Sequence, residues 1–261
     1  PLDRYHRQML LPDFGTKGQE RLSAGHAVVV GCGALGCAIA DHLARAGVGR
    51  MTIIDRDVVE LTNLQRQTLF DERDAAQGMP KAEAARRRLA AVNSEIRIDA
   101  VVADFRAPNA ERIAGLASHR TAHAAAESPE MVLLDGTDNF ETRYLLNDLS
   151  IRHHIPYAYG GAVGMRGMTM TILPGTTACL RCVFEDMPAL GSSPTCDTAG
   201  VFGPAIAAVA ASQASDAIKI LLGRPDLVGP GLTELDLWAN LRRTLDVGGP
   251  RPACPCCGQK H

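Results

Sequence analysis

The chain has 261 residues, of which 46% are hydrophobic and 21% charged, and its net charge at pH 7 is −2. It can bury a full hydrophobic core, either as one domain or as a domain with an appendage. No apolar run of about 18 residues is present to span a bilayer, and the small negative charge disfavours nucleic acid as a partner. The start at Pro1 has no basic segment followed by an apolar stretch, so we predict no secretory signal and expect a cytoplasmic protein.

The first half of the chain alternates between predicted strands and helices. Residues 1–25 form an arm, expected as a short helix and a loop because Pro12, Gly15 and Gly18 interrupt its apolar pattern. Strands are predicted over 26–30, 51–54, 96–102 and 131–134, and helices from the first glycine turn to Ala46 and over 80–92 and 140–153. Residues 26–155 therefore predict a Rossmann-like, mostly parallel sheet with helices on both faces.

The pattern changes after Pro156. Strands are predicted over 157–159, 167–173 and 232–238, separated by long loops rich in glycine and proline, and an alanine-rich helix is predicted over 204–222. We expect residues 156–261 to continue the same α/β domain as a partly antiparallel half.

A glycine turn follows the first predicted strand. Gly31, Gly33 and Gly36 let a phosphate approach the backbone, and the helix that follows presents unpaired N–H groups to it. Asp55, at the end of the second strand, is placed to accept hydrogen bonds from ribose hydroxyls. These features predict a nucleotide site, and by themselves they leave a dinucleotide-binding unit open.

Charged side chains downstream favour ATP over a dinucleotide. Asn63, Arg66 and Gln67 lie in one short segment, and Arg66 and Lys81 can neutralise polyphosphate charge. Asp138 follows the strand over 131–134, at the carboxyl edge of the predicted sheet, where a carboxylate can hold Mg²⁺. The structural alternative is that Arg66 and Lys81 are surface charges and that Asp138 only caps a helix.

The eight cysteines predict a metal site. Cys179 and Cys182 form one Cys-x-x-Cys pair and Cys254 and Cys257 another, and four such thiolates match a tetrahedral structural Zn²⁺ site, with a redox dithiol or buried core cysteines as the alternatives. Because protein would fill all four positions, the zinc would fasten the C-terminal tail to the body. Cys196 lies in a loop-like stretch, where spacing alone favours an inert thiol over a nucleophile.

Several motifs in order along nearly the whole chain resemble the ubiquitin-activating-like adenylyltransferases of molybdopterin and thiamine biosynthesis. They are Arg4-Tyr5-His6-Arg7-Gln8, Leu11-Pro12, Gly18-Gln19, the glycine turn, Ala46-Gly47-Val48-Gly49, residues 63–67, Thr137-Asp138-Asn139, the two cysteine pairs and Thr195-Cys196.

This resemblance implies a homodimer that uses ATP to adenylate the C-terminal Gly-Gly carboxylate of a small ubiquitin-like sulfur-carrier protein. The glycine turn and Asp55 would hold the nucleotide, Arg66 and Lys81 the phosphates, and Asp138 the Mg²⁺. Arg7 matches an arginine that the family supplies across the dimer interface, and Cys196 matches a cysteine that thiamine-branch members bond to the carrier. Gly33-Ala34 replaces a common glycine pair, a change we expect to be tolerated.

The chain ends soon after the second cysteine pair, so we expect a separate sulfurtransferase to supply the sulfur. Three other functions stay open: adenylation of another carboxylate, such as that of a peptide or a tRNA nucleoside, an NAD-dependent oxidoreductase, and a non-catalytic partner subunit.

Overall fold

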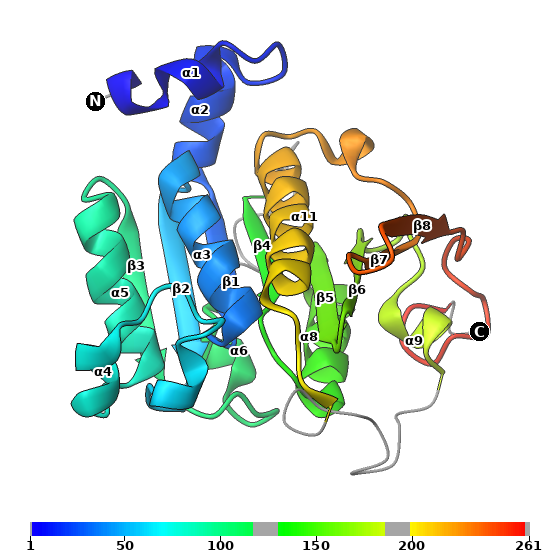
Figure 1. Cartoon of the computed structure of the whole chain (residues 1–261). Coiled ribbons are helices and arrows are strands. Elements are labelled where there is room, and N and C mark those ends of the chain that lie inside the picture. Colours follow the sequence, from blue (N-terminus) through cyan, green and yellow to red (C-terminus); the bar gives the residue numbers. More distant parts are fainter. Residues whose placement is uncertain (1, 117–129, 186–198, 259–261) are drawn as a thin grey trace.

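The computed structural model describes residues 2–116, 130–185 and 199–258. In this part of the chain one sheet runs in the order β3-β2-β1-β4-β5-β6-β7-β8 (Figure 1). Its strands are β1 (His26–Val30), β2 (Arg50–Asp55), β3 (Arg97–Val102), β4 (Met131–Asp135), β5 (Tyr157–Val163), β6 (Arg166–Ile172), β7 (Leu232–Asp236) and β8 (Leu241–Leu245).

The sheet is parallel in its first half and antiparallel in its second. Strands β3, β2, β1, β4 and β5 pair in parallel, whereas β6, β7 and β8 pair in antiparallel fashion. The predicted Rossmann-like α/β fold with a partly antiparallel second half is thus confirmed. Because the parallel strands run the same way, their carboxyl ends meet at one edge of the sheet, which we call the carboxyl edge.

Helices cover both faces of the sheet. They are α1 (His6–Met9), α2 (Gly15–Ala24), α3 (Ala34–Ala46), α4 (Glu72–Ala76), α5 (Lys81–Val92), α6 (Ala110–Ile113), α8 (Phe140–His153), α9 (Leu180–Val183) and α11 (Gly203–Leu221), with short 3₁₀ turns at Leu2–Tyr5, Leu61–Asn63 and Pro225–Leu227. Helices α3, α5 and α11 lie on one face, and α8 lies on the other (Figure 1). All helices in the described part of the chain are too short or too polar to cross a bilayer.

Each face of the sheet has its own hydrophobic core. In β1, Ala27 and Val29 pack under α3, whereas Val28 and Val30 pack on the α8 side. This alternation follows the period of two of a strand, and burial on both faces explains why β1 is apolar throughout.

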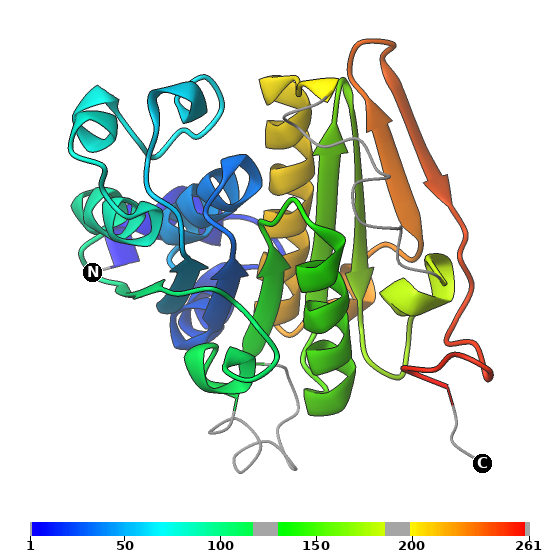
Figure 2. The same ribbon diagram turned by 90° about the horizontal axis from the view of Figure 1, so that it is seen from below.

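Several elements differ from the sequence predictions: the short helices α4, α6 and α9 were not predicted, and α2 and β8 are two larger differences. Helix α2 replaces an expected loop, because Gly18 lets it pack closely against Leu222: an added Cβ there would lie 3.0 Å from the leucine side chain. Strand β8 was not predicted because its residues are exposed and mostly polar, so it has no apolar alternation. The β7–β8 hairpin forms the end of the molecule opposite α4 and α5 (Figure 2).

Candidate functional site

Three glycines pack tightly where β1 and β4 reach the carboxyl edge. Gly31 has a φ of +86°, which favours glycine, and its carbonyl oxygen would lie 1.9 Å from a Cβ added at Gly36 and 2.2 Å from one added at Gly136. The Gly33 N-cap of α3 makes no side-chain cap hydrogen bond. Bare backbone and uncapped N–H groups at a helix N-terminus make a cradle that fits a phosphate.

Asp55 lies beside this glycine turn. Its Oδ2 accepts a hydrogen bond from the Cys32 N–H at 2.6 Å, and its Oδ1 accepts one from the Asp57 N–H at 2.7 Å. Burial raises the pKa of Asp55, although these backbone hydrogen bonds and the Lys81 charge oppose the shift. A carboxylate oxygen can accept more than one hydrogen bond, so the Asp55 side chain keeps acceptor capacity for the predicted ribose contacts.

The segment over residues 61–67 packs against the same turn. The Gln67 amide nitrogen would lie 3.9 Å from a Cβ added at Gly33. Gln67 is buried, and its Oε1 has no hydrogen-bond partner among the residues that the structure describes. Asn63 is also buried and completes a capping box with Glu60. A buried amide oxygen without a partner beside a phosphate-sized cradle fits a ligand-contacting position.

The two cationic side chains predicted to bind phosphates are both held by nearby groups of the protein. The Lys81 Nζ lies 3.3 Å from Asp57 Oδ2, with only 10% of its side chain exposed, at the N-terminus of α5. Arg66 is half-buried, and its guanidinium donates to the Thr62 carbonyl at 3.0 Å. Lys81 is thus held close to Asp55 by its ion pair with Asp57. The Arg66 side chain instead folds back on the 3₁₀ turn at Leu61–Asn63.

Asp138 is exposed just beyond the end of β4. The next residue, Asn139, caps α8 by accepting the Thr142 N–H at 2.9 Å, so Asp138 is not the helix cap. An exposed carboxylate at the edge where the glycine turn lies fits Mg²⁺, which usually takes one or two carboxylates together with phosphate oxygens.

Sequence reasoning missed the buried polar cluster behind Asp138. Asp135 is fully buried at the end of β4, beside Arg143 and the Tyr157 hydroxyl. An acidic residue closing an apolar strand was a possible signal, but its partners come from α8 and β5, and no local pattern joins them.

Arg7 lies far from these residues. It is exposed on α1, and the neighbouring Gln8 donates to the Ala46 carbonyl at 2.9 Å, at the C-terminal end of α3. The glycine turn is at the N-terminal end of the same 13-residue helix, about 20 Å away. The structure therefore does not bring Arg7 to the site of its own chain. Cys196 lies outside the described residues.

Four cysteine sulfurs meet on the face of the sheet that α8 covers. The Sγ atoms of Cys179, Cys182, Cys254 and Cys257 all lie within 4.8 Å of one another, and the Cys179–Cys254 and Cys182–Cys257 pairs are 3.6 and 3.4 Å apart. Four thiolates around Zn²⁺ at about 2.3 Å would be ~3.8 Å apart, so the donor set fits a structural zinc.

Hydrogen bonds fasten this cluster to α8. The Asn147 side chain accepts the Leu180 N–H at 2.7 Å and donates to Cys256 Sγ at 3.4 Å. Arg181 makes two 2.8 Å hydrogen bonds to Asp148. Cysteines from α9 and from the C-terminal segment thus join at one helix, as expected for a site that holds the tail.

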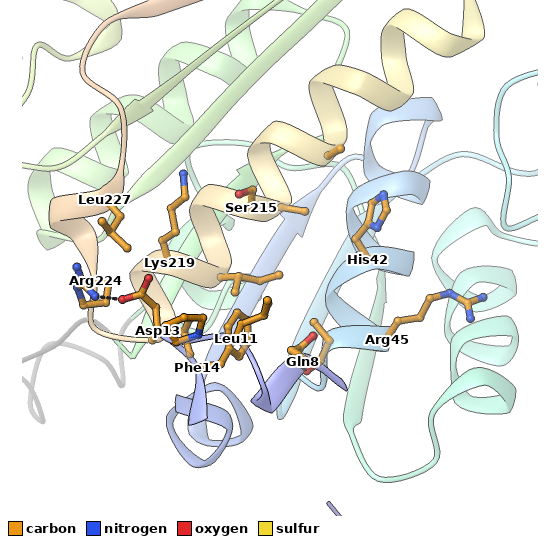
Figure 3. Close-up of a pocket in the computed structure, with 16 residues that line it drawn as sticks. Gln8, Leu11, Asp13, Phe14, His42, Arg45, Ser215, Lys219, Arg224 and Leu227 are labelled. Carbon is orange, nitrogen blue, oxygen red and sulfur yellow. Dashed lines mark hydrogen bonds and ion pairs between the residues drawn. The ribbon is translucent and has the colours of Figure 1, made fainter. Parts of the chain in front are cut away.

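A cavity of about 700 Å³ lies away from the carboxyl edge, between the arm, α3 and α11 (Figure 3). Apolar side chains such as Leu11 and Phe14 line it together with Lys219, and Arg224 pairs with Asp13 at its rim. It lies by the Ala46 end of α3, so it is separate from the nucleotide cradle.

The model of the ThiF family matches residues 5–256. The chain belongs to the ThiF family. Among its ThiF relatives, the Bacillus subtilis sulfur carrier protein ThiS adenylyltransferase is 43% identical over 98% of this chain and 72% of its own length. The Thermus thermophilus sulfur carrier protein adenylyltransferase is 38% identical over 99% and 92%. The Haloferax volcanii SAMP-activating enzyme E1 is 34% identical over 99% and 89%.

Solved structures show the same fold. The crystal structure of E. coli MccB with ATP superimposes with a TM-score of 0.78 and 24% identity, covering 98% of this chain and 75% of that one. At this identity the likeness concerns the fold alone.

Proposed function

We propose that this chain catalyses the ATP-dependent adenylation of the C-terminal Gly-Gly carboxylate of a small sulfur-carrier protein. The observation that carries the proposal is the meeting of the glycine cradle, Lys81 and exposed Asp138 at one sheet edge of a ThiF-family chain. The two relatives with the highest identities above both bear the name of sulfur-carrier adenylyltransferases, which supports the same substrate here.

The chemistry requires little from the protein besides positioning and charge. The carrier carboxylate attacks the α-phosphorus of ATP, the bond to the bridging oxygen breaks, and pyrophosphate leaves with that oxygen. The carboxylate is already a nucleophile, so no general base is needed. Lys81 and Arg66 would offset charge on the phosphates, and the N-terminus of α3 would add its N–H groups.

Asp138 would hold Mg²⁺, which neutralises phosphate charge when it is bound. Gly31, Gly33 and Gly36 would let the phosphates approach the backbone, and Asp55, Asn63 and Gln67 would contact the nucleoside side of the cradle. Zinc at the four cysteines would have no open coordination position, so its role would be structural.

The carrier would dock on the second half of the chain. In this proposal residues 26–155 bind nucleotide, residues 156–261 bind carrier and zinc, and residues 1–25 form the N-terminal arm. Val163, Met165 and Trp238 are exposed at neighbouring hairpin tips, which the pairing of β6 with β7 brings together at the carboxyl edge. An apolar surface beside Asp138 suits a globular carrier whose tail must reach the cradle.

A homodimer would bring Arg7 into the reaction. Since Arg7 is about 20 Å from the cradle of its own chain, it can serve only the partner's site. Cys196 would be the thiol that takes the activated carrier, and a separate sulfurtransferase would supply sulfur.

The test is carrier-dependent exchange of ATP with labelled pyrophosphate. Wild-type protein should exchange with a Gly-Gly-ending carrier, and Asp138→Ala should lose at least ~10²-fold of the rate. Glu20→Ala removes an exposed carboxylate from α2, at the other end of the sheet, and should exchange like wild type. Absence of exchange with every carrier, or full exchange by Asp138→Ala, would refute the proposal. If a peptide supports exchange and no carrier does, the substrate is a peptide carboxylate and not a carrier protein.

A further inference from the structure

A buried ion pair lies directly behind the turn that carries Asp138. Asp135 closes β4 with a side chain that has no exposure, and the Arg143 side chain, in the first turn of α8, is 9% exposed. The Arg143 Nε lies 3.5 Å from Asp135 Oδ2, and that oxygen also accepts a hydrogen bond from the Tyr157 hydroxyl at 2.8 Å. Both charges are therefore removed from water, a cost that a buried pair often fails to recover in stability.

The remaining hydrogen bonds of the pair converge on Thr137. Asp135 Oδ1 accepts the Thr137 N–H at 2.9 Å and the Thr137 hydroxyl at 2.7 Å, and Arg143 Nη2 donates to the Thr137 carbonyl at 3.0 Å. The pair thus fixes the peptide N–H, the side chain and the carbonyl of the residue that precedes Asp138. Without the Asp135 acceptor for the N–H and the hydroxyl, or without the Arg143 donor to the carbonyl, the Thr137 turn would lose these restraints.

The Arg143 guanidinium is held in place from several sides. Its carbon lies 5.2 Å from the Phe140 ring centroid and 5.6 Å from that of Tyr159, and a Cβ added at Gly161 would lie 3.4 Å from Nη2. The planar guanidinium lies over both rings while its Nη2 donates to the Thr137 carbonyl, whereas a lysine ammonium has no planar face to stack on the rings. Burial works against the charged form of Arg143, and the adjacent Asp135 carboxylate opposes this by raising its pKa.

We propose that Arg143, paired with Asp135, is a positioning residue that holds the Thr137 peptide so that the Asp138 carboxylate faces the Mg²⁺ of bound nucleotide. This inference rests on the proposed function and assigns a role to a residue that touches neither metal nor nucleotide. It accounts for a costly buried pair whose side-chain hydrogen bonds, among the residues that the structure describes, end on Thr137 or on Tyr157.

The experiment measures how strongly Mg²⁺ promotes ATP binding, by isothermal titration with and without the metal, alongside exchange rates across a Mg²⁺ series. Arg143→Lys keeps a cation near Asp135 but loses the Nη2 hydrogen bond to the Thr137 carbonyl. We expect its Mg²⁺ midpoint to rise about tenfold, as for lost outer contacts of metal ligands, while ATP binding without Mg²⁺ changes less than about twofold.

Tyr157→Phe is the matched control. It removes a buried hydrogen bond to the same carboxylate without touching the turn, so its melting temperature should fall by about 2–4 °C while its Mg²⁺ midpoint stays at the wild-type value. Thr137→Val changes a half-buried residue of the turn itself and removes the hydroxyl hydrogen bond to Asp135. It should raise the Mg²⁺ midpoint by about threefold. This variant keeps the test usable if Arg143→Lys does not fold.

An unchanged midpoint in both Arg143→Lys and Thr137→Val would overturn the proposal, as would an equal shift in Tyr157→Phe, because the pair would then be structural only. If wild type binds ATP with Mg²⁺ but exchanges no pyrophosphate with any carrier, the proposed function fails while the binding test of Arg143 still gives its answer.

Discussion

Replacing Gly36 by alanine tests whether the glycine cradle is as tight as it looks. The new Cβ would lie 1.9 Å from the Gly31 carbonyl oxygen, so the two must separate by about 1 Å to reach even the closest Cβ contacts seen in proteins. Gly31 has little room to move, because a Cβ added there would lie 2.6 Å from the carbonyl oxygen of Gly136, the residue that follows β4. The clash is between backbone atoms on both sides, and no flexible side chain can absorb it.

The magnitude follows from two opposing effects. Overpacking of this kind costs ~3 kcal/mol, and the better helix propensity of alanine within α3 returns ~1 kcal/mol, so the net loss of unfolding free energy should be ~2 kcal/mol. For a chain of this size that lowers the melting temperature by about 4–8 °C. A displacement of the turn by about 1 Å should also raise the KM for ATP at least tenfold.

Gly33→Ala is the comparison variant, measured by thermal unfolding without nucleotide. Gly33 has a φ of −78°, and its nearest neighbour would be 3.7 Å from an added Cβ, so its melting temperature should stay within about 2 °C of wild type. If Gly36→Ala melts and binds ATP like wild type, or if both variants lose the same stability, the close packing of Gly31, Gly36 and Gly136 does not constrain the turn.

Two further predictions concern the metal cluster and a surface carboxylate. Cys254→Ser should lose about one zinc per chain and several kcal/mol of unfolding free energy. Cys256→Ser should keep its zinc, because Cys256 is outside the four-sulfur cluster. Metal analysis and melting curves test both variants, and equal zinc in the two would contradict the assignment. Hydrogen bonds from His153 and Arg152 lower the pKa of Glu111 below its ordinary value of 4.5, so its stabilising contribution is present above pH 4.5 and is lost as the pH falls through the lowered value. The melting temperature of Glu111→Gln should therefore fall below that of wild type at pH 7 and approach it in acid; a constant difference down to pH 3 would show that the carboxylate charge is not responsible. Both proteins share the same cysteine cluster, so its acid sensitivity cancels in the comparison.

Local pattern was enough for most of the parallel half. The predicted helix over 140–153 coincides with α8, and the predicted strand over 51–54 lies within β2, because apolar periodicity and turn residues are local signals. The spacing of the two cysteine pairs also predicted that they come together, because a tetrahedral metal site needs four ligands and each pair supplies two. Strand β8 escaped because an exposed edge strand has no buried side chains to give it a pattern.

Residue pattern alone is enough to predict the α/β class, the glycine turn followed by Asp55, and the four thiols of the zinc-type cluster, because each depends on residues close together in the chain or on strict spacing. Three-dimensional packing is what closes the cradle with Gly136 and places Arg7 at the other end of α3. It leaves the buried Gln67 oxygen without a hydrogen-bond partner among the described residues. It also brings Asp135 and Arg143 to the turn before Asp138. These relations join different strands and helices, and they depend on approaches of a few ångströms that the sheet order sets and that no residue pattern records.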